Sequence, residues 1–259
     1  MNIERVENAI SIFKSRLDHP LDDAGRAYFV PAPEKGRRFV ISDIHGCFQT
    51  FSSLLEKIKL KKKDQLFVIG DMVDRGPYSM LVLEKIVSLL EDGYRVFPSL
   101  GNHEQILLNL QTTATADLFI FSKRQNAQHL LDEKYLVRKE LRLFLESLPY
   151  YFETEDHFLV HAGFNTRIDE PFSDWQSMLW TRDYKYHEKK LKGKKVIHGH
   201  VPKSLSTIKR TIKNGDKNIC IDNGCVKAEA SGYGKLICYE LNSGKYTFKK
   251  NNDLVKALY

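Results

Sequence analysis

The sequence predicts an α/β fold built as one principal domain. Short apolar runs at 38–42, 66–70 and 94–101 are typical of buried strands, and helical patterns at 51–58 and 80–90 lie between them. This alternation of strand and helix predicts parallel strands with helices on the sheet faces. The chain has 259 residues, of which 42% are hydrophobic, so a sizeable core is expected.

An amphipathic helix is predicted at the N-terminus and should pack on the main body, because apolar residues recur there at helical spacing. These residues are Ile3, Val6, Ile10, Phe13 and Leu17. The Pro-Ala-Pro stretch at 31–33 ends this segment, and a different rhythm follows it. We therefore divide the chain into an N-terminal helical extension, residues 1–36, and a main domain, residues 37–259.

The middle of the chain, residues 103–148, is predicted to be mostly helical and to end at Pro149. Two strand-like runs follow it at 150–154 and 157–161. The predicted apolar face of this helical region consists of Leu130, Leu131, Tyr135, Val137, Leu141, Phe144, Leu145 and Leu148.

The C-terminal third is predicted to be mainly β, with turns at Asn214-Gly215 and Ser243-Gly244. We expect its strands to form a second, more antiparallel sheet. Nothing in the composition marks a linker between the two halves, which favours one α/β domain. The strand-like segments of this third are 195–200, 204–210, 217–222, 235–241 and 245–250.

Composition and charge exclude several classes of protein. No apolar run reaches the length of about 18 residues that a membrane helix needs, and charges interrupt residues 1–17, where a signal peptide needs an apolar centre. We therefore expect a soluble, cytoplasmic protein. The net charge of +7 is concentrated in lysine clusters at 57–63 and 185–195. These clusters favour a solvated face over a nucleic-acid surface, because no aromatic-interleaved binding module accompanies them.

The cysteines indicate a reducing environment. The four residues Cys47, Cys220, Cys225 and Cys238 include no CxxC pair. Neither a zinc knuckle nor a dense disulfide framework is therefore predicted. Reduced thiols in a cytosolic protein fit this pattern best.

Reactive polar side chains follow the predicted strands, at the points where the strands end. Such segments are SDIHG at 42–46, GDMVDRG at 70–76, GNHE at 101–104, HAG at 161–163 and HGH at 198–200. One such segment would be explained by turn chemistry, but five in order make coincidence improbable. Carboxylates and imidazoles at successive strand ends converge in space, and together they suit manganese, iron, zinc or magnesium better than copper.

With these motifs the sequence resembles the PPP-type metallophosphoesterase family of serine/threonine protein phosphatases, particularly its bacterial and phage members. The family pattern GDxHG, GDxVDRG, GNHE, HAG and GH is met within residues 38–250, with Ser42 in place of the first glycine. The resemblance implies a metallophosphoesterase β-sandwich of two mixed sheets flanked by helices, with a helical insert. Because the implied metal ligands are intact, we expect Ser42 to alter a turn and not the chemistry.

The resemblance implies two divalent metal ions. We expect manganese, although iron or zinc would accept the same donors. The shared carboxylate of Asp71 would hold the ions about 3.5–4 Å apart. The last ligand is assigned to His200, with His198 as the alternative, and Asp222 and Asn223 either support the site or form only a turn. The implied ligands are Asp43, His45 and Asp71 for the first ion, and Asp71, Asn102, His161 and His200 for the second.

The resemblance also implies the catalytic groups. His103 would be the general acid that protonates the leaving alkoxide, and Asp74 would orient its ring and favour the protonated form. Arg75 and Arg182 match the phosphate-binding arginines of the family, and a guanidinium group is a natural ligand for two phosphoryl oxygens.

These roles predict a phosphatase for phosphoserine or phosphothreonine in proteins, in which water attacks phosphorus directly. The alternative is a symmetrical dinucleoside tetraphosphate (diadenosine tetraphosphate) hydrolase or a related nucleotide phosphohydrolase. Those relatives usually carry a small residue where Asp74 stands, so the phosphatase is favoured. A catalytically silent phosphate- or RNA-binding module would have lost ligands, and none is lost. The expected partner is a phosphoprotein or a small phosphorylated molecule; neither nucleic acid nor a membrane is favoured.

Overall fold

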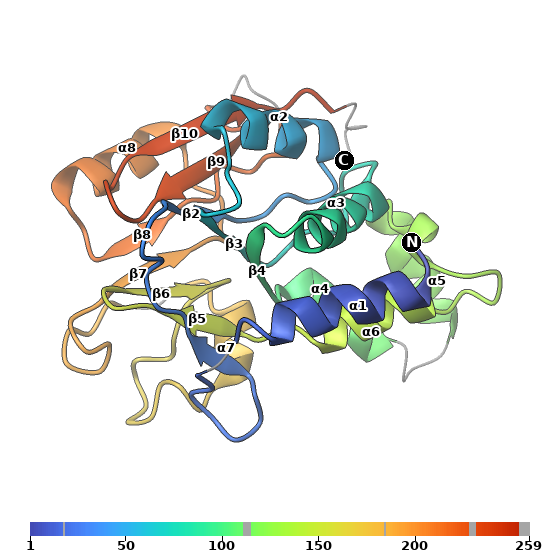
Figure 1. Cartoon of the computed structure of the whole chain (residues 1–259), viewed down its shortest axis with the longest axis horizontal. Coiled ribbons are helices and arrows are strands. Elements are labelled where there is room, and N and C mark those ends of the chain that lie inside the picture. The colour runs from blue at the N-terminus through green and yellow to red at the C-terminus, as the bar shows by residue number, and fades with distance from the viewer. Residues whose placement is uncertain (18, 111–114, 184, 228–231, 254–259) are drawn as a thin grey trace.

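The structure is a computed structural model that describes residues 1–17, 19–110, 115–183, 185–227 and 232–253. It contains two five-stranded mixed sheets, which confirms the predicted sandwich (Figure 1). One sheet has the order β1 (Ala27–Phe29), β5 (Tyr151–Glu153), β6 (His157–Val160), β7 (Lys195–His198) and β8 (Asn218–Cys220). The other has the order β10 (Tyr246–Lys250), β9 (Lys235–Glu240), β2 (Arg38–Ile41), β3 (Gln65–Ile69) and β4 (Arg95–Ser99).

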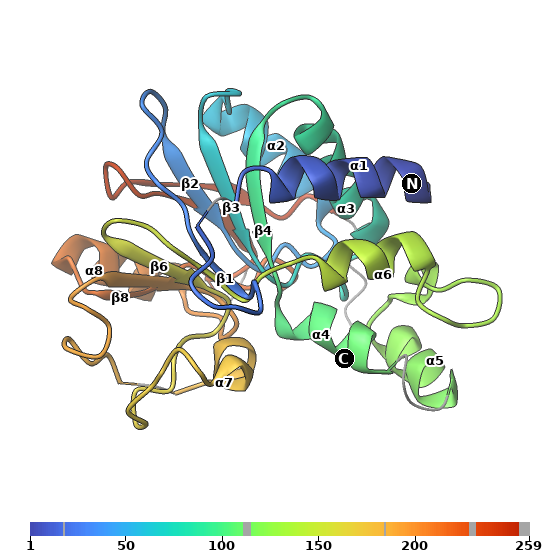
Figure 2. The ribbon, with the colours of Figure 1, turned by 60° about the horizontal axis from the view of Figure 1, so that its bottom comes forward.

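Helices cover the outer faces of the sandwich and extend it on one side (Figures 1 and 2). Among the described residues, no helix combines the length and the apolar character that crossing a membrane requires. The α-helices are α1 (Ile3–Lys14), α2 (Phe48–Ile58), α3 (Ser79–Glu91), α4 (Asn102–Leu110), α5 (Thr115–Arg124), α6 (Lys139–Glu146), α7 (Trp175–Trp180) and α8 (Leu205–Asn214), and a short 3-10 helix spans Gln128–Leu130.

The predicted parallel unit is confirmed. Strands β2, β3 and β4 pair in parallel, with Val40 opposite Phe67 and Phe67 opposite Phe97. Helices α2 and α3 are the connections between them. Every residue of β2 and β3 is buried, as expected for strands covered on both faces.

The predicted second, antiparallel sheet from the C-terminal third is wrong. Strand β9 pairs antiparallel with β2, so β9 and β10 extend the sheet of the N-terminal strands. Strand β7 instead pairs in parallel with β6 and with β8 in the opposite sheet. The C-terminal third therefore contributes to both sheets. Local strand patterns carry no information about which distant strand becomes the neighbour.

The segment 204–210, which was expected to be a strand, is the first part of helix α8. Ser204 caps this helix by accepting a hydrogen bond from the Thr207 amide at 3.3 Å. The alternation of apolar and polar residues is too short here to distinguish the two structures, and Ile208 is the buried contact. Gly215, expected in a β-turn, ends the helix in the left-handed conformation with φ of 71°.

The helical region between β4 and β5 is interrupted, and its predicted apolar face is partly wrong. Tyr135 is 53% exposed and has a left-handed φ of 59°, because it lies in a turn between the 3-10 helix and α6. The remaining predicted members of the face, Leu130, Leu131, Val137, Leu141, Phe144, Leu145 and Leu148, are buried.

The N-terminal segment packs on the main body as predicted. Val6, Ala9 and Phe13 of α1 are fully buried, and the helix contacts α3 and α6. Strand β1, which was not predicted, pairs in parallel with β5. The division of the chain at residue 36 stays a prediction, and residues 254–259 of the proposed main domain lie outside the described residues.

The two sheets meet through an aromatic cluster of Phe67, Phe97 and Phe152. Phe67 and Phe97 stack with ring centroids 5.0 Å apart, and the ring of Phe152 from the opposite sheet meets them at 5.6 and 6.0 Å. All three side chains are fully buried. The cluster therefore fixes how the two sheets pack against each other.

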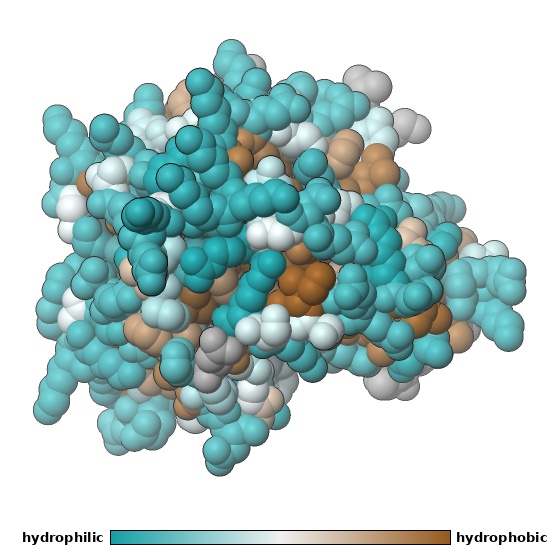
Figure 3. All heavy atoms as spheres, in the orientation of Figure 1, coloured by the Kyte–Doolittle hydropathy of each residue, from teal (hydrophilic) through white to brown (hydrophobic). Residues whose placement is uncertain are grey.

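The surface seen in Figure 3 is mainly hydrophilic, with a small hydrophobic patch near its centre.

We expect Phe152→Ala to lower the free energy of unfolding by about 3–5 kcal/mol, because a cavity replaces a ring that contacts both sheets. Urea denaturation followed by circular dichroism measures this effect. As the control, Ile120→Ala, at a side chain that is 48% exposed, should change the value by less than about 0.5 kcal/mol. Equal effects of the two substitutions would contradict the assigned core.

Candidate active site

The five strand-end segments lie at one edge of the sandwich, where both sheets contribute. Residues 43–46 follow β2, residues 71–76 follow β3, and α4 begins directly after the loop that follows β4. From the other sheet, residues 161–163 follow β6 and residues 199–200 follow β7. These are the carboxyl ends of parallel strands, where ligand sites of α/β proteins lie.

The carboxylate of Asp71 lies between two groups of potential ligands. Its Oδ2 atom is 3.4 Å from His45 Nε2 and 3.9 Å from His103 Nε2. Its Oδ1 atom is 3.5 Å from His161 Nε2. His45, Asp71 and His103 form one group that could hold a metal ion, and Asp71, His161 and His200 form the other. The bridging position predicted for Asp71 thus agrees with the geometry of its two oxygens.

The donors in the second group have the spacing of a metal site. Asn102 Oδ1 lies 2.9 Å from His161 Nε2 and 3.0 Å from His200 Nδ1, and the two nitrogens are 3.2 Å apart. Tetrahedral bonds of about 2.0–2.1 Å place neighbouring donors about 3.4 Å apart. These residues therefore fit a divalent ion.

Ring tautomers support the same conclusion. His45 Nδ1 lies 2.9 Å from the Val73 carbonyl oxygen, and His161 Nδ1 lies 3.2 Å from that of Ile69. A carbonyl oxygen only accepts hydrogen bonds, so each Nδ1 carries the proton and each Nε2 of the neutral ring presents a lone pair. Burial lowers the pKa of both rings, which keeps them neutral. Both lone pairs face oxygens of Asp71, an arrangement that a bound cation fits, and the lone pair of His45 also faces the Arg75 guanidinium at 3.0 Å.

Buried acidic groups surround these histidines. Both oxygens of Asp43 accept from the His200 amide at 3.1 Å. Burial, together with the charges of Asp222 and Asp71, raises the pKa of Asp43 well above its usual range. Burial likewise raises the pKa of Asp222 to about 7. Carboxylates that repel one another in a buried site are stabilised as anions by a bound metal.

The backbone at this edge is strained. Left-handed φ angles between 47° and 70° occur at Asp43, His45, Asp71, Asp74, Arg75 and His200. Each such residue costs of order 1–3 kcal/mol, and such strain clusters at functional sites. Asp43, Asp71 and His200 are each the second residue after a strand, so these left-handed residues lie in the turns at the strand ends.

The first motif has Ser42 where the family pattern has a glycine, and the backbone at this position accepts a side chain. The corresponding glycine of the next motif, Gly70, has φ of 78°, and a Cβ atom there would lie 2.6 Å from the Gly101 Cα. Ser42 is buried and lies outside the left-handed region, so a side chain is accepted. In contrast, Gly199 is required, since a Cβ would come within 1.8 Å of Asp43 Oδ2.

Glu104 is a site residue to which the sequence interpretation gave no role, although it is the fourth letter of GNHE. Its carboxylate accepts hydrogen bonds from the amides of Gly101, Asp71, Met72 and Val73 at 2.8, 2.9, 2.7 and 3.2 Å. The side chain is fully buried, and burial raises its pKa to about 7. Glu104 thereby holds the loop after β3, including Asp71, against the start of α4.

His103 belongs to the first group and also forms a close pair with Asp74. His103 Nδ1 donates to Asp74 Oδ2 at 2.7 Å, and its Nε2 faces Asp71. Burial alone would lower the pKa of His103, but the charge of Asp71 and the hydrogen bond to Asp74 raise it above its usual value. The hydrogen bond to Asp74 therefore fixes the orientation of the ring and favours its charged form.

The arginines differ in how closely they approach this cluster. The Arg75 guanidinium lies 3.0 Å from Nε2 of both His45 and His103. The Arg75 amide donates to the Gln125 carbonyl oxygen at 2.5 Å, so the helical insert holds this loop. Arg182 is exposed and lies near enough to His200 for its charge to lower the pKa of that ring, after the larger effect of burial.

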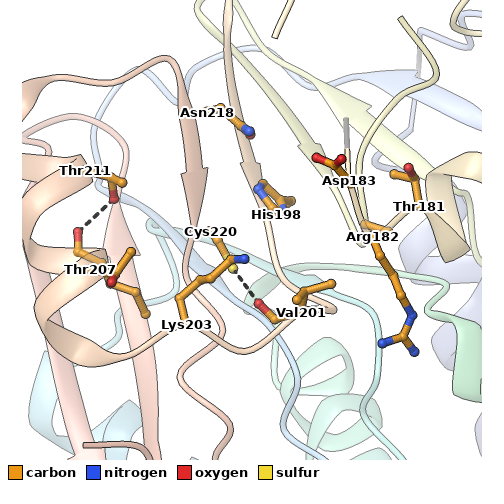
Figure 4. A pocket seen from close by; sticks show the side chains of 12 residues that line it. Thr181, Arg182, Asp183, His198, Val201, Lys203, Thr207, Thr211, Asn218 and Cys220 are labelled. Atoms are coloured by element: carbon orange, nitrogen blue, oxygen red, sulfur yellow. Dashed lines mark hydrogen bonds between the residues drawn. The ribbon is translucent and has the colours of Figure 1, made fainter. Parts of the chain in front are cut away.

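The structure separates the two histidines of the HGH segment. His200 joins the second group through its Nδ1 atom. His198 instead lines a neighbouring cavity, with Nδ1 3.2 Å from the Gly199 carbonyl oxygen (Figure 4). Asp222 is buried beside the cluster and accepts from the Gly224 amide at 2.6 Å, while Asn223 donates to the Lys203 carbonyl oxygen at 2.8 Å.

A two-layer sandwich with these donors at its edge is the architecture of a metallophosphoesterase. The chain belongs to the calcineurin-like phosphoesterase family, whose profile matches residues 36–233. The family identified from the motifs is thereby confirmed. Membership implies a metal-dependent hydrolase with divalent ions, and the two groups around Asp71 are the candidate site.

Curated relatives fall into two kinds of enzyme. Serine/threonine-protein phosphatase 1 of Salmonella typhimurium is 27% identical over 152 residues, which cover 56% of this chain and 68% of that protein. The symmetrical bis(5'-nucleosyl)-tetraphosphatase of Nitrosospira multiformis is 32% identical over 126 residues, which cover 48% of this chain and 42% of that protein. The match therefore spans less than half of the tetraphosphatase.

Solved structures share the fold at low sequence identity. A protein serine/threonine phosphatase from Saccharomyces cerevisiae aligns with a TM-score of 0.61 and 16% identity, over 97% of this chain and 89% of that chain. A cold-active protein-tyrosine phosphatase of a psychrophilic Shewanella aligns with a TM-score of 0.54 and 18% identity, over 86% and 82% of the two chains. These likenesses show the fold.

We expect Glu104→Gln to lower the free energy of unfolding of the metal-free protein by about 3 kcal/mol, because a single amide oxygen replaces two acceptors and leaves buried amides without partners. Urea denaturation in the presence of a chelator measures this loss. Glu133→Gln, at an exposed position, is the matched control and should be neutral. A change below about 0.5 kcal/mol for Glu104→Gln would show that the carboxylate does not hold the loop.

Proposed function

We propose that this protein is a two-metal phosphatase that hydrolyses phosphoserine or phosphothreonine in proteins. The observation that carries the proposal is the His103–Asp74 pair, joined at 2.7 Å, with the other ring nitrogen directed at the carboxylate that both ligand groups share. A proton donor beside a two-metal site is what departure of a poor leaving group, such as an alkoxide, requires.

The proposed ligand sets are those expected from the motifs. Two divalent ions, most simply manganese, would supply Lewis acidity that activates water and stabilises charge on the phosphoryl oxygens. His200 is proposed over His198 as the last ligand, because its Nδ1 lies 3.0 Å from Asn102 Oδ1. The sets are Asp43, His45 and Asp71, and Asp71, Asn102, His161 and His200.

The chain's own residues then hold the substrate and deliver a proton. Arg75, at the edge of the cluster, and Arg182 beside His200 bind phosphoryl oxygens through their guanidinium groups. Asp74 keeps the His103 ring in place and stabilises its charged form. His103 donates the Nε2 proton to the leaving oxygen.

We also propose that the protein is cytoplasmic. Its buried free cysteines support this location.

A second candidate is the symmetrical hydrolysis of dinucleoside tetraphosphates. It is favoured by relatives of that name, one of which, from Buchnera aphidicola, is 48% identical over 67 residues that cover 26% of this chain and 23% of that protein. The same ligands and the same arginines would serve this reaction. The leaving nucleoside diphosphate needs less protonation than an alkoxide, so the His103–Asp74 pair favours the phosphatase.

Substrate comparison tests the proposal. With manganese, the protein should release phosphate from phosphoserine and phosphothreonine peptides faster than it produces adenosine diphosphate from diadenosine tetraphosphate. Phosphate release and chromatography of the nucleotides measure the two rates as kcat/KM. Intact phosphopeptides together with rapid cleavage of the dinucleotide would overturn the phosphatase and establish the second candidate.

Leaving-group dependence tests the proposed acid. His103→Asn should lower kcat about 10²–10⁴-fold for a phosphoserine peptide, because the alkoxide must then leave without a proton. The loss should be much smaller for p-nitrophenyl phosphate, whose leaving group is stable as an anion. Asp74→Asn, the matched variant at the other end of the hydrogen bond, should show the same selectivity with a smaller loss. Equal losses for both substrates would argue against the acid role.

A further inference from the structure

A cavity of about 230 Å³ adjoins the proposed metal site, and, apart from Arg182, its lining has no role in the proposed reaction. It lies between β7, β8, the first turns of α8 and the segment that carries Arg182 (Figure 4). Liquid water takes up about 30 Å³ per molecule, so a polar group much larger than water fits. Its lining includes Ala162, Arg182, Asp183, Val201, Lys203 and Thr207.

The cavity and the metal site share one wall. Ala162 and Val201 line the cavity, and each directly follows one of the histidines, His161 and His200, whose ring nitrogens meet at 3.2 Å in the second ligand group. Consecutive Cα atoms are about 3.8 Å apart. The cavity and the second ligand group are therefore separated by about one residue of the chain on each of these two segments.

Lys203 gives the cavity its positive charge. Figure 4 shows its ammonium group directed into the cavity near Cys220, below the ring of His198. The lysine side chains that form ion pairs in the described part of the chain are Lys190, Lys192, Lys194 and Lys217, and Lys203 is not among them. An ammonium group aimed into a partly enclosed space without a carboxylate partner attracts an anion.

The rest of the lining is compatible with an anion. Thr207 Oγ1 accepts a hydrogen bond from Ser204 Oγ at 3.0 Å, which leaves its own hydroxyl hydrogen available for donation. Among the described residues of the lining, Asp183 is the one that is acidic, and Figure 4 shows it on the far side of His198 from Lys203. Arg182 lines the cavity on the side away from Lys203, where Figure 4 shows its guanidinium group.

We propose that this cavity is an accessory anion subsite that binds a second phosphoryl group of the substrate, with Lys203 as its cation and Thr207 as a hydrogen-bond donor. The inference rests on the proposed phosphoesterase function, because the first phosphoryl group must lie at the metal site. The second phosphoryl group has two possible sources, a polyphosphate chain or a second phosphorylated residue of a peptide, and both share the chemistry that the subsite recognises.

Steady-state kinetics of Lys203→Met test the subsite. The substrates are phenyl phosphate, with one phosphoryl group, and two compounds with more, diadenosine tetraphosphate and a peptide with two phosphoserines. For one of these two multiply phosphorylated compounds, Lys203→Met should raise KM about tenfold relative to KM for phenyl phosphate, since a charge-assisted hydrogen bond is lost. Lys203→Arg should restore most of the ratio. The compound that shows the effect identifies the source of the second group.

Lys209→Met is the matched control, because Lys209 is an exposed lysine of helix α8, six residues after Lys203, and does not line the cavity. Its KM ratios should equal those of the unmodified protein. Thermal melting of all variants checks that the fold is retained. Unchanged KM ratios in Lys203→Met for both multiply phosphorylated compounds would overturn the subsite.

A binding measurement separates failure of the subsite from failure of the proposed function. Calorimetric titration of the metal-free protein with pyrophosphate should show binding that Lys203→Met weakens about tenfold and Lys209→Met does not. If phenyl phosphate is not hydrolysed but this dependence on Lys203 is present, the phosphatase is wrong and the anion subsite stands. If pyrophosphate binds both variants equally, the subsite is wrong whatever the hydrolytic activity.

Discussion

The structure depends on how the carboxylate of Asp71 is held. Its oxygens point at two separate groups of donors, and Glu104 binds the amide of Asp71 together with those of Met72 and Val73. One buried acid thus positions another. The cost of placing two carboxylates so close in a buried site is offset by backbone amides for Glu104 and, in the proposed enzyme, by metal ions for Asp71.

The strained loops around this carboxylate require a rigid support. Left-handed φ angles at residues such as Asp43 and His200 are unfavourable in isolation and persist because packing leaves the chain no alternative. The aromatic cluster of Phe67, Phe97 and Phe152 joins the sheets that carry the two halves of the site. Strands from both sheets end at the same edge, so the core determines how far apart the two sets of ligands lie.

Much of the fold, and the convergence of most residues of the candidate site, could be predicted from the sequence, because apolar runs end in residues of distinctive chemistry. The strand after Gly36 and the histidine that follows it are examples, at Arg38–Ile41 and His45. Sheet neighbours could not be predicted, because β9 meets β2 almost two hundred positions away. The helix at Leu205–Asn214 was missed because its cap, Ser204, outweighs a short alternating pattern. The role of Glu104 was missed because it acts on backbone amides, which no side-chain pattern records.

The hydrogen bond from the Arg75 amide to the Gln125 carbonyl oxygen gives the helical insert a place in the evolution of such proteins. Gln125 lies outside every catalytic motif, and its contact uses only a backbone atom. A change in the length or shape of the insert would therefore shift the loop that carries Arg75 without changing any motif residue. Selection for a new substrate would then act through a segment that tolerates sequence change, while the ligands and their supporting acid stay constant.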